Sequence, residues 1–189
     1  MVKIQAVRGV SLALSRGEVL AIVGESGCGK SVLCKAVMKL LPPTARIRAG
    51  RIFLNGIDIT DYREREMRKL RGRAFSMVFQ DPMTALNPTI PVGRQIAEAV
   101  RAHNHRLPEA AVRQKVLALM ELVGIERGAE RYDLCPHSFS GGMRQRAVMA
   151  AALAADPLLL FADEPTTALD VTVQAQILDL LREIQQKKG

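Results

Sequence analysis

The feature that most constrains this chain is a glycine-rich octapeptide, residues 24–31, with the sequence Gly-Glu-Ser-Gly-Cys-Gly-Lys-Ser. It follows Val19 to Val23, a run of small and β-branched residues that predicts a strand buried on both faces. It leads into Lys30 to Leu41, which is typical of a helix and is stopped by Pro42-Pro43. A strand, a glycine loop and a helix in this order predict a parallel α/β sheet that binds its ligand at the carboxyl ends of the strands.

The octapeptide predicts a cradle for a polyphosphate. Its residues fit the spacing G-x-x-x-x-G-K-[ST], in which glycines let successive backbone N–H groups point into one concavity at the positive end of a helix. We expect Lys30 to bridge the β- and γ-phosphates and the Ser31 hydroxyl to ligate Mg²⁺. The other cradle residues are Gly24, Glu25, Ser26, Gly27, Cys28 and Gly29. The alternative, a glycine-rich turn that matches by chance, does not account for the strand before it and the helix after it.

A second apolar strand is predicted at Leu158 to Ala162, and it ends in the two carboxylates Asp163 and Glu164. Beside a bound nucleotide, Asp163 would hold the metal and Glu164 would polarise the attacking water. The alternative is a buried strand followed by a solvated acidic turn, and the glycine loop elsewhere in the chain weighs against it. A third buried strand is predicted at Ala74 to Phe79, directly before Gln80.

The rest of the chain predicts short strands first and helices later. Asn55-Gly56 favours a two-residue hairpin turn, and an apolar stripe ending at Gly124 indicates an amphipathic helix. The further expected elements are strands at Val10 to Leu14 and on both sides of Asn55-Gly56, a turn at Arg16-Gly17, and helices at Arg63 to Arg71, Gly142 to Ala155 and Val171 to Gln186. We therefore predict three parts: residues 1–80, a helical subdomain at 81–139, and residues 140–189.

Composition narrows the classes of function. The net charge of +8 over 189 residues fits phosphate-rich ligands or a site beside anionic lipid as well as it fits nucleic acid. Nucleic acid is disfavoured because Trp is absent and aromatics make up only 4% of the chain, too few for base-stacking platforms. The three cysteines lack metal-ligand spacing and favour a reducing cytosol. Asp156-Pro157 interrupts the most apolar segment, so any membrane-spanning part must come from another chain.

Five motifs in fixed order resemble the nucleotide-binding domain of ABC transporters. The octapeptide looks like the Walker A motif, and Leu159 to Asp163 looks like the Walker B strand. Phe139 to Met143 is similar to the family signature, Gln80 to the Q-loop glutamine, and Ala168 to Asp170 to the D-loop. Together they cover nearly the whole chain and imply a P-loop NTPase core with a parallel sheet, a small antiparallel part and an inserted helical subdomain.

The resemblance implies an ATPase that binds ATP and Mg²⁺. Its catalytic residues would be Glu164, Lys30 and Gln80, and its metal ligands Ser31, Gln80 and Asp163. Two such domains would pair head to tail as a homodimer or heterodimer, so that Ser140, Gly141 and Gly142 contact the nucleotide held by the partner. The assembly would lie on the cytoplasmic side of the cell membrane, with a polytopic permease docking near Gln80 and the helical subdomain. An extracytoplasmic solute-binding protein would take part indirectly.

A narrower likeness concerns the solute. Phe79 to Pro88, Pro136-His137 and Ala162 to Thr172 resemble the ATPases of dipeptide, oligopeptide and nickel importers. Three alternatives stay open at this point. The first is a soluble ABC-type ATPase of a non-transport complex, and the second is a truncated nucleotide-binding chain with weak hydrolysis. The third is a nucleotide-dependent scaffold that does not hydrolyse ATP.

The sequence departs from the family pattern in two places that matter. No aromatic residue precedes Phe53, where the family has one that stacks on adenine. The only histidines are His103, His105 and His137, all before Glu164, whereas the family has a switch histidine on a later strand. We expect the chain as written to bind nucleotide weakly and to turn over poorly. Phe139 replaces the leucine of many members and keeps the position apolar.

Overall fold

The computed structural model describes residues 4–167 and 169–188. They divide into two compact units, Met1–Arg71 and Gly72–Gly189, which we describe separately. Both units mix helices with short strands, as the predicted α/β class requires. Within the described residues, no helix is both long and apolar enough to cross a bilayer.

The first unit contains helix α1 (Lys30–Val37), strands β1 (Phe53–Leu54) and β2 (Ile57–Asp58), and helix α2 (Glu64–Leu70). The hairpin prediction is confirmed: β1 and β2 pair antiparallel, with positive φ at Asn55 and Gly56. The helix α1 ends four residues before the predicted Leu41. Lys39 leaves the helix with φ 52° and donates from Nζ to the carbonyls of Thr60 and Tyr62 at 2.6 and 2.5 Å, which ties this end of α1 to the chain before α2.

The strands predicted at residues 10–14 and 19–23 are wrong. These residues, all of which the structure describes, form no strand, although the turn at Arg16-Gly17 is present with Gly17 at φ 72°. The side chains expected to be buried on both faces are exposed, Val23 at 91% and Val19 at 69%. β-branched residues favour a pleated, packed surface, but they form a strand only where a neighbouring strand supplies ladder hydrogen bonds, and here none does.

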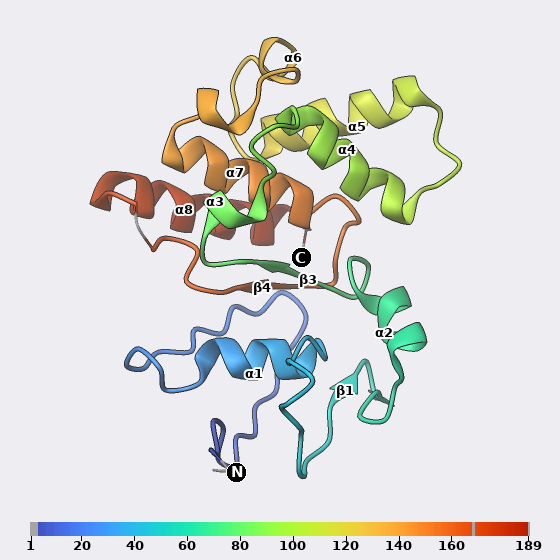
Figure 1. Cartoon of the computed structure of the whole chain (residues 1–189), viewed down its shortest axis with the longest axis vertical. Helices are drawn as coiled ribbons and strands as arrows, with labels where there is room; N and C mark the ends of the chain where they lie inside the picture. The colour runs from blue at the N-terminus through green and yellow to red at the C-terminus, as the bar shows by residue number, and fades with distance from the viewer. Residues whose placement is uncertain (1–3, 168, 189) are drawn as a thin grey trace. The chain divides into compact units, whose positions relative to one another are not determined.

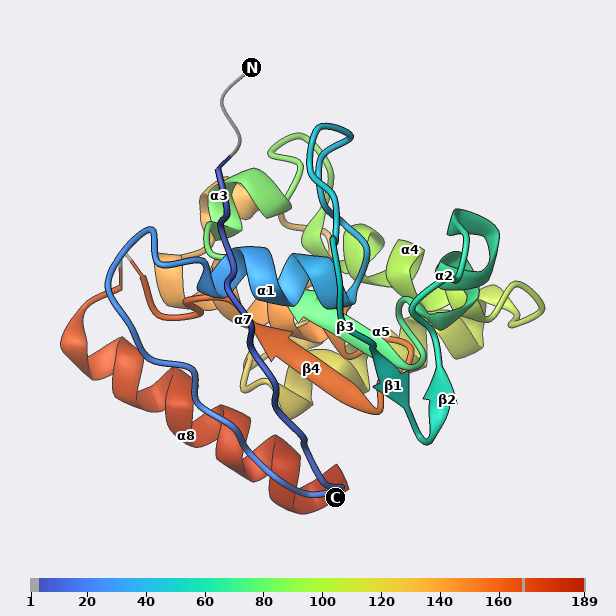
Figure 2. The ribbon, with the colours of Figure 1, turned by 90° about the horizontal axis from the view of Figure 1, so that it is seen from below.

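The second unit carries the principal sheet and most of the helices. Strands β3 (Phe75–Val78) and β4 (Leu159–Ala162) confirm two of the predicted strands. They run side by side in the same direction (Figure 2), with Phe75 opposite Leu159 and Val78 opposite Ala162. The helices are α3 (Pro82–Ala85), α4 (Val92–His103), α5 (Glu109–Leu122), α6 (Gly128–Arg131), the 3₁₀ turn η1 (Pro136–Ser138), α7 (Gly141–Ala152) and α8 (Val171–Lys188).

Helix α7 lies at the centre of the second unit. It contacts β3 on one side and the pair α4–α5 on the other (Figure 1), and it also meets α3 and α8. Its buried residues include Ala147, Val148, Met149 and Ala150, and the two alanines allow neighbouring elements to approach the helix closely. The α5 stripe is confirmed, because Val112, Val116, Leu119 and Val123 are buried and Gly124 follows at φ 72°. The core therefore holds α7 and the strand ends at a fixed distance from each other.

The charged and terminal helices also match their predictions in type, with shifted ends. Helix α2 begins one residue later than Arg63, and α7 begins at Gly141 and stops at Ala152, three residues before the predicted end. Helix α8 extends to Lys188 instead of Gln186. Residues 82–138 are mainly helical, in accord with the expected texture of this region, and their separation as a subdomain at 81–139 stays a prediction.

Candidate functional site

The glycine loop has the backbone geometry that its residue types predict. Gly27 has φ 80° and Gly29 has φ 102°, a region that L side chains rarely adopt. A Cβ on Gly29 would also lie 2.5 Å from the backbone oxygen of Ala6, and one on Gly24 would lie 2.8 Å from Cys28 Sγ. The space beside Gly24 and Gly29 is therefore too small for larger residues at these positions.

The loop fits a phosphate group at the beginning of α1. Gly29 is the N-cap residue of this helix and makes no side-chain capping bond, and the positive end of the helix suits an anion. Lys30 turns back into the loop and donates from Nζ to the carbonyls of Gly24 and Glu25 at 2.8 and 2.9 Å. These bonds hold the ammonium group in the concavity, where a bound polyphosphate would replace the two carbonyls as its hydrogen-bond partner. Ser31 lies in the first turn of α1 beside it.

The acidic turn after β4 lies beside the residue that follows β3. The backbone N–H of Asp163 continues the ladder by donating to Val78 O at 3.0 Å, and Asp163 itself is buried at 6% exposure. Gln80 Nε2 donates to Glu164 Oε2 at 2.8 Å across 84 positions of sequence. The structure thus brings together three predicted site residues, Gln80, Asp163 and Glu164, at the carboxyl ends of the parallel strands.

The Glu164 carboxylate has a second partner that sequence reasoning did not assign. Thr167 Oγ1 donates to Glu164 Oε2 at 3.1 Å, and Thr167 N–H donates to Glu164 O at 3.1 Å. Glu164 also has φ 47°, an uncommon conformation for a residue with a side chain and one that is often found at functional sites. The signal in the sequence was the threonine pair after Pro165, whose hydroxyls suit a turn that bonds back to a carboxylate.

The predicted signature forms the beginning of α7. Ser140 is the N-cap residue, as expected, and its Oγ accepts from Met143 N–H at 3.3 Å. Gly142 is packed so closely that a Cβ would lie 2.7 Å from Val173 Cγ1, in the first turn of α8. A Cβ on Gly141 would lie 3.5 Å from Leu169 Cδ2, which is ordinary contact. The signature therefore touches the segment after the acidic turn, although Ala168 of the expected D-loop lies outside the described residues.

The predicted site residues thus fall into groups within the two units. Residues 24–31 form the loop of the first unit, whereas Gln80, Asp163, Glu164 and the signature belong to the second. The predicted Mg²⁺ ligands Ser31, Gln80 and Asp163 come from both units, and their joint coordination stays a prediction. Among the described residues, no three His, Cys, Asp or Glu side chains gather as a metal site of their own.

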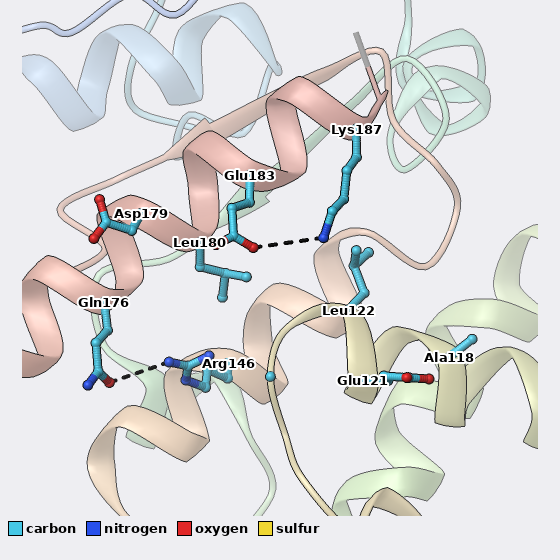
Figure 3. Close-up of a pocket in the computed structure, with 10 residues that line it drawn as sticks. Ala118, Glu121, Leu122, Arg146, Gln176, Asp179, Leu180, Glu183 and Lys187 are labelled. Carbon is cyan, nitrogen blue, oxygen red and sulfur yellow. Dashed lines mark hydrogen bonds and ion pairs between the residues drawn. The ribbon is translucent and has the colours of Figure 1, made fainter.

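One hollow of the second unit involves none of these residues. It is a groove of about 610 Å³ between α5, α7 and α8 (Figure 3). Its cations are already bound: Arg146 donates to Val123 O at 2.6 Å and to Gln176 Oε1 at 3.5 Å, and Lys187 pairs with Glu183 at 3.8 Å. With these internal bonds made, the groove offers no cluster of cations to a phosphate, and the loop before α1 is the better candidate.

A glycine loop that leads into a helix, together with a parallel strand that ends in buried and hydrogen-bonded acids, defines the class of P-loop nucleotide-binding proteins. The family model described as "ABC transporter" matches residues 7–167. The chain belongs to this ABC transporter family, and the predicted resemblance is confirmed.

Individual relatives agree with the family. The chain is 56% identical over 185 residues to a dipeptide transport ATP-binding protein of Bacillus subtilis, covering 97% of this chain and 55% of the relative. It is 53% identical over 186 residues to an oligopeptide transport ATP-binding protein of the same organism, covering 98% of this chain and 52% of the relative. The chain therefore spans about half the length of these curated relatives.

The structural comparison confirms the predicted fold class. A dimeric ATP-binding cassette in a post-hydrolysis state, bound to ADP and Pi, superposes with a TM-score of 0.82 at 28% identity. The match covers 97% of this chain and 76% of that one.

Proposed function

We propose that this chain is the ATP-binding and ATP-hydrolysing part of an importer for small peptides. The observation that carries the proposal is the hydrogen bond from Gln80 to Glu164 at the carboxyl end of a parallel strand pair, beside the buried Asp163. The proposal is supported because α/β proteins of this class bind nucleotide at the carboxyl ends of their strands, where this amide and these two carboxylates lie. The peptide transport names of the relatives at 56% and 53% identity support the choice of solute.

In this proposal the protein binds the phosphates and the metal ion and supplies one proton acceptor. The backbone of residues 24–29, Lys30 and the N-terminus of α1 bind the phosphates. Ser31, Gln80 and Asp163 would hold Mg²⁺, which neutralises charge on the phosphate oxygens. Glu164 accepts the proton of the attacking water, and its bonds to Gln80 and Thr167 fix the orientation of the carboxylate.

The signature residues would act on a second copy or a related chain. Ser140, Gly141 and Gly142 stand at the N-terminus of a twelve-residue helix, which presents backbone N–H groups and a positive end suited to an anion. We infer that they contact the γ-phosphate held by the partner, so that ATP joins two subunits and hydrolysis releases them. Membrane permease subunits would dock near Gln80 and the helices at residues 82–138, on the cytoplasmic side of the cell membrane.

The substitution Glu164→Gln tests the proposal. It keeps the size of the side chain but removes the proton acceptor, so hydrolysis should fall by at least about 100-fold while ATP binding persists. The chain should then elute as a dimer with ATP and as a monomer without it, in size-exclusion chromatography coupled to light scattering. Lys30→Ala in the same background should abolish the dimer by removing phosphate binding. A Glu164→Gln chain that binds ATP and stays monomeric would exclude the shared site.

Co-purification decides between the transporter and the soluble alternative. When the chain is expressed with its neighbouring genes, a polytopic membrane protein should be retained by an affinity tag on this chain. Retention of soluble proteins alone would favour the non-transport complex.

A further inference from the structure

A second groove of the second unit has a composition unlike the nucleotide site. It occupies about 370 Å³ along the faces of α4 and α5. Six residues line it, and five of them are charged: Arg94, Arg101, Glu109, Arg113, Tyr132 and Asp133. None of them belongs to the glycine loop, the acidic turn or the signature. We call this hollow the arginine groove.

The floor of the arginine groove is rigid. Tyr132 is only 4% exposed, and its backbone oxygen accepts from Gly93 N–H at 2.9 Å. The next turn is fixed in the same way, because Leu134 O accepts from Val92 N–H at 2.9 Å. A Cβ on Gly93 would overlap the Tyr132 ring, so the ring rests directly on the backbone of α4. Glycine costs about 1 kcal/mol in a helix relative to alanine, and here it makes room for this ring.

The three arginines of the groove differ in the partners that their guanidinium groups already have. Arg101 forms an ion pair with Glu109, which leaves it largely neutralised. Arg113 stacks over the Tyr132 ring with its guanidinium carbon 4.2 Å from the ring centroid. Such stacking uses the face of the guanidinium group and leaves its N–H edge for a hydrogen-bond acceptor. Among the described residues, no side chain forms a hydrogen bond or ion pair with the guanidinium group of Arg94.

The charge balance selects the kind of anion. Three arginines face two carboxylates, Glu109 and Asp133, so the lining carries a net charge of +1. The single charge of a carboxylate balances that surplus, whereas a phosphate dianion would leave the filled groove with a net charge of −1 beside Glu109 and Asp133. The groove in Figure 3 differs, because its cations already have internal partners and three carboxylates, Glu121, Asp179 and Glu183, line it.

The shape of the groove suits a chain segment better than a free ion. Arg94 and Arg101 are seven residues apart on one helix, which separates their Cα atoms by about 10 Å along its axis. A small ion would fill one end of such a groove, and water would still fill the other end. An extended or helical protein segment could place one acidic side chain between Arg94 and Arg113 and lay its backbone along the remainder.

We propose that the arginine groove is a docking site for an acidic side chain of a protein partner, with Arg94 and Arg113 as the residues that bind its carboxylate. The site is independent of nucleotide chemistry, and it stands even if the chain neither binds nor hydrolyses ATP. Arg113 is held in place by the buried Tyr132 ring, so the binding geometry exists before the partner arrives.

A titration of arginine Nε–Hε signals in nitrogen-labelled protein tests the proposal. The probes are two short, acetylated and amidated peptides of alanine and glutamine that differ only in one central residue, Glu or Gln, and inorganic phosphate as a third arm. The Glu peptide should shift the signals of Arg94 and Arg113 saturably and bind at least about tenfold more tightly than the Gln peptide. Arg94→Gln and Arg113→Gln should each weaken binding of the Glu peptide about three- to tenfold, as for partly exposed charge pairs.

Arg127→Gln is the matched control. Arg127 is exposed and pairs with Glu130 at 3.6 Å, so its loss removes the same charge elsewhere in the second unit. It should leave the affinity for the Glu peptide unchanged. Equal binding of the Glu and Gln peptides, absence of saturable shifts, an equal loss in Arg127→Gln, or tighter binding of phosphate than of the Glu peptide would each overturn the proposal.

Discussion

The contact between Gly142 and Val173 makes a quantitative prediction about the signature. In Gly142→Ala the new Cβ would lie 2.7 Å from Val173 Cγ1, closer than carbon atoms approach without displacement. Valine is β-branched and stiff at χ1, so it cannot rotate away cheaply, and overpacking of this kind costs about 1–3 kcal/mol. The substitution also gains up to about 1 kcal/mol of helix propensity. We expect a net loss in the free energy of unfolding of up to about 2 kcal/mol.

Gly141→Ala is the matched comparison, because it lies in the same turn of α7 and gains the same propensity. Its Cβ would lie 3.5 Å from Leu169 Cδ2, which needs no displacement. Gly141→Ala should therefore be neutral or more stable than the parent, and the two variants should differ by about 1–3 kcal/mol. In a Val173→Ala background, which removes the clashing methyl group, the cost of Gly142→Ala should largely disappear.

Tyrosine fluorescence during urea unfolding can measure this difference in one unit. The chain has two tyrosines and no tryptophan, so Tyr62→Phe leaves Tyr132, in the second unit, as the reporter. The parent and every variant compared with it would carry this substitution. Equal stability of the two alanine variants, or an undiminished cost of Gly142→Ala when Val173 is alanine, would refute the account of why glycine stands at position 142.

Two further predictions follow from single buried or partly buried groups. Gln145 is 1% exposed, and its Nε2 has no hydrogen-bond partner among the described residues. Gln145→Leu should therefore raise the free energy of unfolding by about 1 kcal/mol in the same urea assay. A loss of stability would show that the amide is paired. Burial, aided by neighbouring cations, lowers the pKa of His103 below 6.5, so the unfolded chain binds this proton more readily than the folded one. The contribution of His103 to the free energy of unfolding should therefore be constant above about pH 6.5 and fall as the pH drops from there towards the folded pKa. His103→Gln should flatten this part of the stability profile. An unchanged profile would show that His103 does not cause the pH dependence.

Local signals in the sequence predicted local structure well. Asn55-Gly56 forms its hairpin because the turn depends on two residues that tolerate positive φ. The stripe that ends at Gly124 forms an amphipathic helix because its spacing repeats every turn. The prediction of a strand at residues 19–23 was wrong because a strand needs a neighbouring strand to pair with, and composition does not say whether one is present. The arginine groove was invisible for a similar reason, since its residues come from three separate segments and follow no spacing rule.

The meeting of Gln80 and Glu164 shows how a site can depend on packing at a distance from it. Each residue was predicted at the end of a strand, but their hydrogen bond follows from the register that sets Val78 opposite Ala162. Each side chain lies two residues beyond its member of that pair. A slip of one residue would turn the side chains of one strand to the opposite face and separate the amide from the carboxylate. The register is held by buried side chains of β3, Phe75, Met77 and Val78, so substitutions that loosen this packing should impair the site without touching it.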